Sequence, residues 1–205
     1  MITIATLLAM SISLFAQSEG TSAFKKFYLL GGGGGSSNHG TSSSIGAEAI
    51  LKSNWLVGVS YNYLKIAPNN LPSDYVRGYA LFIPDPLPNI KLKLVNFMGG
   101  KLFPTGEKTW ITTQAGLSIV TGEKMTFTHE SNINAIIVAT SNYATYTSPE
   151  STIGAMLKLD FNWAICPYVG LGVGSFANLN SIESPVGIEF RLIAGWLNTK
   201  KKAGK

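Results

Sequence analysis

Apolar residues recur at every second position between residues 24 and 197, in segments of about ten residues. Three segments show this most clearly, with apolar residues at Trp55, Val57, Val59, Tyr61 and Tyr63; at Ile153, Ala155, Leu157, Leu159, Phe161 and Trp163; and at Val186, Ile188, Phe190, Leu192, Ala194 and Trp196. Small or polar residues mostly occupy the positions between them. Successive side chains of a β-strand point to opposite faces, so the pattern predicts strands with one apolar face. About ten residues is also the length that a tilted strand needs to cross a bilayer.

The whole pattern predicts eight strands, an even number as in bacterial outer-membrane barrels. The strands are expected at 24–34, 42–52, 54–65, 90–103, 109–120, 152–163, 167–176 and 186–197. The fourth is the least regular, because Asn96 falls on the face that Leu92, Leu94 and Met98 make apolar. A β-bulge at this point would restore the register of that strand.

The expected connections alternate in length along the chain. Those at 52–54, 104–108 and 164–166 are short, whereas those at 66–89 and 121–151 are long. Outer-membrane barrels have short periplasmic turns and longer outer loops, so both ends of the barrel domain are expected in the periplasm.

The tryptophans lie beside the short turns, which predicts an interfacial aromatic rim at that level. Trp55 and Trp110 begin their strands, and Trp163 and Trp196 end theirs. Trp110 has the parity of the inward face, so it is interpreted as a rim residue that does not face lipid. Tyr61, Tyr63 and Phe176 are expected at the opposite rim.

Composition narrows the choice of membrane architecture. Hydrophobic residues make up 45% of the chain and charged residues only 13%, with a mean hydropathy of +0.20. No internal stretch contains the roughly 18 consecutive apolar residues that a helical span needs. Only helices and closed barrels satisfy every backbone polar group in lipid, so a membrane-spanning form of this chain would be a barrel.

The N-terminal residues have the character of a secretory leader. Residues 2–15 are mainly apolar and residues 16–20 turn polar, which predicts a signal peptide at 1–16 that is cleaved after Ala16. A buried first strand or helix is the alternative interpretation of this run. The predicted organisation is then a signal peptide at 1–16, a barrel domain at 17–197 and a basic tail at 198–205.

The eight alternating strands, the leader and the closing segment Gly187 to Leu192 resemble the small outer-membrane β-barrel superfamily, which includes OmpA-like, OmpX-like and OmpW-like barrels. The resemblance implies an all-β fold, an eight-stranded antiparallel up-and-down transmembrane β-barrel in the bacterial outer membrane. It also implies that the barrel-assembly machinery recognises the last strand through Gly187, Phe190 and Leu192. Outer-membrane lipid is the second expected partner.

Six charged residues have inward parity and are expected to form a charge network in the lumen. They are Glu48, Lys101, Lys158, Asp160, Glu189 and Arg191. An eight-stranded interior is only wide enough for side chains to fill, which predicts a plug and not an open channel. Arg191 is expected to pair with Glu48 or Asp160, and inward Gly170, Gly172 and Gly174 would leave room for bulky neighbours. The alternative is a water-soluble barrel, because alternation alone does not say which face meets water.

No catalytic constellation, metal site or cofactor motif is evident. His39 and His129 fall in outer loops, and no spacing fixes either of them against a serine nucleophile and a carboxylate such as Glu48. The glycine run 31–35 lacks the Gly-Lys-Ser/Thr of a nucleotide loop, and Cys166 is the only cysteine. The basic excess is largely in the C-terminal tail, which argues against a nucleic-acid partner.

The long loops are the candidate sites for a surface partner. Loop 66–89 contains five prolines, and loop 121–151 is expected to extend two strands beyond the membrane as a hairpin with a free edge. The leading hypothesis is a non-enzymatic outer-membrane protein with a plugged lumen, which serves envelope integrity, adhesion or surface interaction. The alternatives are a narrow channel or carrier for small or hydrophobic solutes, an enzyme acting on lipid A, and a soluble lipocalin-like carrier.

Overall fold

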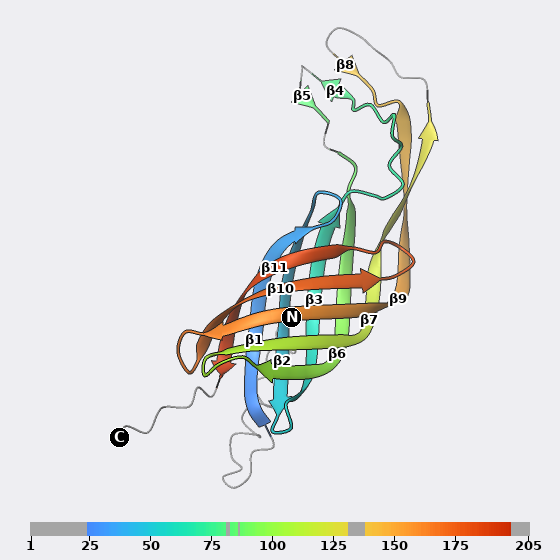
Figure 1. The fold of residues 1–205 in the computed structure, drawn as a ribbon. Coiled ribbons are helices and arrows are strands. Elements are labelled where there is room, and N and C mark those ends of the chain that lie inside the picture. Colours follow the sequence, from blue (N-terminus) through green and yellow to red (C-terminus); the bar gives the residue numbers. More distant parts are fainter. Residues whose placement is uncertain (1–23, 81–82, 86, 131–137, 198–205) are drawn as a thin grey trace, which may run out of the picture.

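A closed antiparallel β-barrel forms the body of the protein (Figure 1). The computed structural model describes residues 24–80, 83–85, 87–130 and 138–197, so the expected signal peptide and basic tail lie outside the described residues. The barrel strands are β1 (Phe24–Ser36), β2 (Gly40–Leu51), β3 (Trp55–Ile66), β6 (Ile90–Pro104), β7 (Thr109–His129), β9 (Tyr143–Ala164), β10 (Val169–Leu179) and β11 (Val186–Trp196). Among the described residues there is no helix long and apolar enough to cross a membrane.

The strand order confirms the predicted up-and-down topology. Each barrel strand pairs with the barrel strand before and after it in the chain, and β1 pairs with β11 to close the sheet. Antiparallel neighbours need only tight turns, which explains the short links at 52–54, 105–108 and 165–168. These three turns define the short-turn end of the barrel, where β1 begins and β11 ends. The opposite end is called the long-loop end.

The seam between β1 and β11 depends on a run of glycines. Gly31–Gly35 of β1 lie opposite residues 188–192 of β11, with Gly32 paired to Arg191 and Gly34 paired to Glu189. A Cβ at Gly32 would lie 2.6 Å from the Arg191 Cγ, and one at Gly34 would lie 1.8 Å from the Ile188 carbonyl oxygen. The close approach of β11 therefore requires the absence of a side chain at Gly32 and Gly34.

Strand β6 corrects one prediction from the sequence. It pairs with β3 and β7 without any shift in register, so the expected bulge at Asn96 is absent. Leu92, Leu94 and Met98 all lie with Asn96 on the buried, inward face. Apolar side chains pack inside this barrel as well as on its outer surface. Apolar character alone therefore assigned this strand to the wrong face.

The interior consists of two apolar clusters with a polar belt between them. The cluster at the short-turn end contains Tyr28, Leu30, Ile50, Leu56, Leu102, Trp110, Ala164, Ile193 and Leu197. The cluster at the long-loop end contains Leu64, Ile66, Ile90, Leu92, Leu94, Met98, Val120, Met125, Met156, Phe176 and Ile182. Phe176, expected at the outer rim, is thus part of the interior, where its inward parity on β10 directs it.

The outer surface carries a wide apolar belt. Its large exposed side chains include Ile45, Val57, Val59, Phe97, Leu117, Ile119, Ile153, Leu157, Leu159, Phe161, Leu171, Val173, Ile188, Phe190 and Leu192. A contiguous apolar surface of this extent would be unfavourable in water and is suited to a bilayer. Trp55, Trp163 and Trp196 are exposed at the short-turn end of this belt. Trp110 lies at the same level but is 1% exposed, inside the barrel.

Strands β7 and β9 continue past the barrel as a two-stranded ribbon, which rises to the top of Figure 1. The pairing of β6 with β7 ends at Thr121 and that of β10 with β9 ends at Ala155, yet β7 and β9 remain paired up to His129 and Tyr143. Short strands β4 (Tyr79–Ala80), β5 (Ile83–Pro84) and β8 (Val138–Ala139) form a separate small sheet above the barrel. The predicted extension of these two strands past the barrel is confirmed.

Candidate functional site

The polar belt of the interior contains five of the six charged residues that were expected there. Glu48 comes from β2, Lys158 and Asp160 from β9, and Glu189 and Arg191 from β11. None of these residues is more than 7% exposed. Their inward direction follows from the alternation of each strand, because the residues before and after each of them point to the outer surface of the barrel.

An ion pair between Arg191 and Asp160 joins β11 to β9 across β10. The Arg191 Nη2 lies 2.7 Å from the Asp160 Oδ1, and both side chains are almost completely buried. The hydroxyl of Thr112 on β7 donates to the other oxygen of the same carboxylate, at 3.2 Å. The structure thus places Arg191 against Asp160, one of the two carboxylates that the sequence offered as its partner.

Gln114 on β7 connects this ion pair to a second buried carboxylate. Its side-chain Nε2 donates to the Asp160 Oδ2 at 3.0 Å and to the Glu48 Oε1 at 2.9 Å. The Tyr28 hydroxyl donates to the remaining oxygen of Glu48, at 2.8 Å. Hydrogen bonding of this kind offsets part of the cost of burying charge. Sequence reasoning missed Gln114, although its inward parity on β7 was readable.

A second group of hydrogen bonds surrounds Glu189 on β11. Ser44 Oγ and Asn62 Nδ2 donate to its two carboxylate oxygens, at 2.9 and 3.1 Å. Asn96 in turn donates to Asn62 Oδ1 at 2.7 Å and accepts from the hydroxyl of Ser118. The irregular asparagine of β6 is therefore a member of the polar belt, which explains a polar residue on an otherwise apolar inward strand.

Lys101 does not belong to the interior, contrary to the expectation. It is exposed on the outer surface of β6, with its Nζ 6.0 Å from the Trp55 ring centroid and 5.9 Å from that of Phe103. Lys101 lies outside because the two faces of β6 are the reverse of those expected, with Leu92, Leu94 and Met98 pointing inward. Lys26 on β1 is the interior lysine that was missed, with its Nζ 3.6 Å above the buried Trp110 ring. Trp110 accordingly packs within the barrel and is not part of the exposed rim.

Gly174 on β10 leaves the space that the ion pair occupies. A Cβ at this position would lie 2.1 Å from the Asp160 Oδ1 and 3.0 Å from the Arg191 Nη2. Gly174→Ala is therefore expected to destabilise the barrel by about 1–3 kcal/mol, because the carboxylate cannot move without weakening its bonds. Urea unfolding in detergent micelles measures the change. Ser175→Ala, on the outward face next to it, is the control, and equal stability of the two variants would contradict the prediction.

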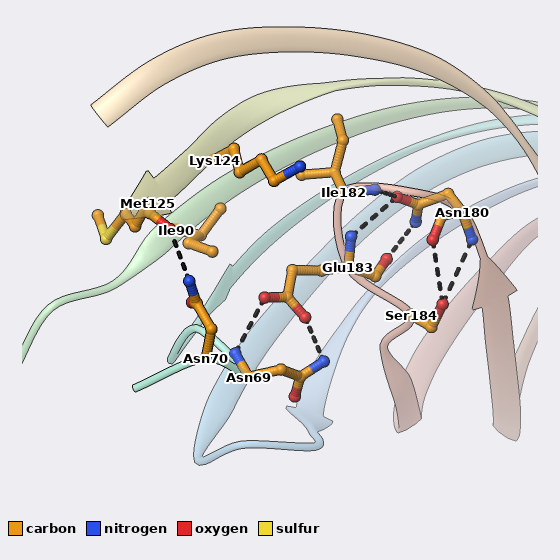
Figure 2. A pocket seen from close by; sticks show the side chains of 9 residues that line it. All are labelled: Asn69, Asn70, Ile90, Lys124, Met125, Asn180, Ile182, Glu183 and Ser184. Carbon is orange, nitrogen blue, oxygen red and sulfur yellow. Dashed lines mark hydrogen bonds between the residues drawn. The ribbon is translucent and has the colours of Figure 1, made fainter. Parts of the chain in front are cut away.

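A crevice of about 290 Å³ opens at the long-loop end (Figure 2). Its lining residues are Asn69, Asn70, Ile90, Lys124, Met125, Asn180, Ile182, Glu183 and Ser184. The buried Glu183 carboxylate accepts from the backbone N–H of Asn69 at 2.9 Å and from its side-chain amide. Asn180 Oδ1 accepts from the backbone N–H groups of Ile182 and Glu183. The bonds between Asn69 and Glu183 join loop 67–78 to loop 180–185, and those of Asn180 stabilise the second loop internally.

Loop 67–78 also packs against one face of the β7–β9 ribbon. The Tyr143 hydroxyl donates to the Asp74 carboxylate at 2.9 Å, and the Val76 backbone N–H donates to the Asn142 side chain at 2.8 Å. The Tyr75 ring lies 6.1 Å from that of Phe127 and 6.3 Å from that of Tyr143. These contacts fix an otherwise isolated two-stranded ribbon, which alone would be marginally stable.

The two histidines lie apart from the carboxylates considered for catalysis. His129 packs edge-on against Tyr143, with 5.2 Å between ring centroids. His39 lies in the turn between β1 and β2, whereas Glu48 is held inside the barrel by Tyr28 and Gln114. Within the described ranges, no group of three or more His, Cys, Asp or Glu residues is arranged to hold a metal ion.

Comparison with known proteins identifies the fold through structure alone. No protein-family model and no curated protein sequence matches the chain. The crystal structure of neisserial surface protein A is similar, with a TM-score of 0.54 and 15% identity over 83% of this chain and 97% of that one. The N-terminal β-barrel domain of Pseudomonas aeruginosa OprF is similar with a TM-score of 0.52 and 9% identity, over 84% and 98% of the two chains. The chain thus has the fold of the small eight-stranded outer-membrane barrels, and its apolar outer belt is that of a barrel placed in the outer membrane.

Proposed function

We propose that this protein is a non-enzymatic outer-membrane anchor that presents a surface-interaction element, the β7–β9 ribbon and the loops packed against it. The observation that carries the proposal is the continued pairing of β7 and β9 beyond the barrel. Eight residue pairs, from Gly122 with Glu150 to His129 with Tyr143, lie beyond the last pairing of β7 with β6. At about 3.4 Å per residue the ribbon projects on the order of 25 Å from the barrel.

Over its described residues the ribbon presents an open face and edges that have no strand partner, although the Asn70 side chain donates to the Met125 carbonyl of β7. Tyr75 and the rest of loop 67–78 cover the face that contains Phe127 and Tyr143. The opposite face is exposed and contains Lys124, Thr126, Thr128, Tyr146 and Ser148. Beyond the barrel, β7 no longer pairs with β6 and β9 no longer pairs with β10. Exposed strand edges of this kind accept an additional strand from a partner, which supports a role in adhesion or surface interaction.

The packing of the interior supports an anchor in preference to a conduit. Apolar side chains fill the barrel at both ends, and a belt of ion-paired and hydrogen-bonded side chains lies between them. Trp110 and Lys26 close the short-turn end, where the Lys26 ammonium lies over the indole ring. We therefore propose that the lumen is plugged. Planar-bilayer recordings of the purified protein are expected to show no steady conductance, and a stable open pore would favour the channel hypothesis.

Removal of the ribbon is expected to abolish surface binding and to leave the barrel intact. Gly122 and Glu150 are cross-strand partners, so a two-residue turn between them can replace residues 123–149. The shortened variant should show normal heat-modifiable migration, because the barrel pairs of β7 and β9 remain. Adhesion of expressing cells to matrix proteins and cell-to-cell aggregation are the measurements.

The comparison needs three strains, expressing the full chain, the shortened variant or neither. Uptake of a membrane-impermeant dye reports envelope integrity, and both barrels are expected to restore it equally. Adhesion by the shortened variant at the level of the full chain would overturn the proposed role of the ribbon. A full chain that adheres no better than the empty strain would overturn the surface-interaction function as a whole.

A further inference from the structure

Three lysines lie together on the outer surface of the barrel, at its long-loop end. Lys65 is near the end of β3, and Lys91 and Lys93 are near the start of β6. Lys65 and Lys91 are register partners. Lys93 is paired with Tyr63, two residues along the strands toward the short-turn end. All three lysines are exposed. The pairing of β3 with β6 thus brings together three ammonium groups on one face of the sheet.

Repulsion within this lysine trio is not relieved by an ion pair among the described residues. Directly opposite residues of an antiparallel pair have Cβ atoms about 5 Å apart, and like charges at such positions are destabilising. The ion pairs of the described residues are Lys124 with Glu150 and Arg191 with Asp160, and neither includes a member of the trio. Glu123, two residues beyond Thr121 on β7, is half-buried and is in neither of these ion pairs. An anion from outside the chain would relieve this repulsion.

The position of the trio on the barrel indicates where that anion comes from. Toward the short-turn end of the same two strands, the outward residues Tyr61, Val95 and Phe97 belong to the exposed apolar belt. The trio therefore lies where the apolar belt ends and lipid headgroups begin. Long loops face the cell exterior in these barrels, so the headgroups at this level are those of the outer leaflet.

We propose that the lysine trio binds the phosphate groups of a phosphorylated glycolipid in the outer leaflet. Lysine ammonium groups recognise phosphate as point charges, and three of them match the charge of a headgroup with two phosphates. The hydroxyls of Thr41 and Thr121 lie beside the trio, paired with Lys65 and Lys93, and supply further donors. The acyl chains of the same lipid would lie along Tyr61 and Phe97.

Lysines at the opposite rim are not clustered, and two of them have partners within the chain. Lys25 donates to the Asn54 side chain at 2.7 Å, and Lys101 lies between the Trp55 and Phe103 rings. Lys52 and Lys108 lie in separate turns. These residues therefore provide a matched control, because their removal changes the net charge equally without removing a cluster.

The test compares two triple variants of the full mature chain in neutral detergent. One is Lys65→Gln, Lys91→Gln and Lys93→Gln, and the control is Lys52→Gln, Lys101→Gln and Lys108→Gln. Each is titrated with bisphosphorylated lipid A and with its dephosphorylated form. The trio variant is expected to bind the phosphorylated lipid at least about tenfold more weakly than the wild type, because each basic residue near an anionic surface contributes to binding. The control variant is expected to stay within about threefold of the wild type.

Three results would overturn the proposal. They are an equal loss of affinity in both triple variants, equal wild-type affinity for the two forms of the lipid, and displacement of the lipid by inorganic phosphate at equal concentration. Heat-modifiable migration verifies that each variant is folded. If the trio variant does not fold, the wild-type comparison of phosphorylated with dephosphorylated lipid still decides the outcome.

Discussion

Arg191→Met is expected to destabilise the folded barrel by about 3–5 kcal/mol, because it leaves the Asp160 carboxylate buried and unpaired. The Asp160 carboxylate lies 2.7 Å from the guanidinium and is 2% exposed, so water cannot replace the lost partner. The double variant Arg191→Met with Asp160→Asn should be more stable than the sum of the single changes predicts. Urea unfolding in detergent micelles, followed by tryptophan fluorescence, measures all four members of this cycle.

Glu48→Gln provides the matched control for the cycle. Glu48 is equally buried, but its hydrogen bonds come from Tyr28 and Gln114, and the structure shows no direct bond to Arg191. Its coupling to Arg191→Met is therefore expected to be smaller than that of Asp160→Asn. Additive effects in the Asp160 cycle, or equal coupling in both cycles, would show that the ion pair is not the organising contact of the belt.

The second large effect is expected on the outer surface, at Leu157 of β9. Leu157 is 48% exposed in the apolar belt and lies between Ala115 of β7 and Ala177 of β10. Leu157→Arg should impair assembly, because a basic residue near the bilayer midplane costs roughly 2–4 kcal/mol in such barrels. Leu157→Phe keeps the surface apolar and is the control. Wild-type levels of heat-modifiable protein in the membrane fraction for the arginine variant would contradict a lipid-facing position.

The alternation of the sequence was sufficient to predict all eight strands and their topology, but not the face of every strand. In β9, polar and apolar residues alternate from Leu157 to Trp163, so the inward positions of Lys158 and Asp160 could be read directly. In β6, apolar residues occur on both faces, because Leu92 and Leu94 pack inside while Val95 and Phe97 face outward. The apolar positions of β6 therefore do not show which face points inward, and Lys101 was predicted inside the barrel although it lies on the outer surface.

The partners within the polar belt could not be derived from the sequence. A carboxylate and a guanidinium of inward parity were evident, but the choice of Asp160 over Glu48 depends on how far strands are staggered around the barrel. The same holds for Gln114, which joins residues of β2 and β9 although it belongs to β7. The outer ribbon was predictable because its two strands adjoin a single loop, whereas its packing against Tyr75 depends on a loop distant in sequence.

The seam between β1 and β11 has a consequence for how the barrel forms. Arg191 and Glu189 reach the belt only when the last strand is in place, and Gly32 and Gly34 of β1 leave the space that this strand occupies. A sheet that lacks β11 would hold Glu48 and Asp160 without Arg191, and Ser44 and Asn62 without their acceptor. A sheet without its last strand therefore lacks both the ion pair and the acceptor of the belt, and closure of the seam and completion of these buried polar contacts should occur as one cooperative event.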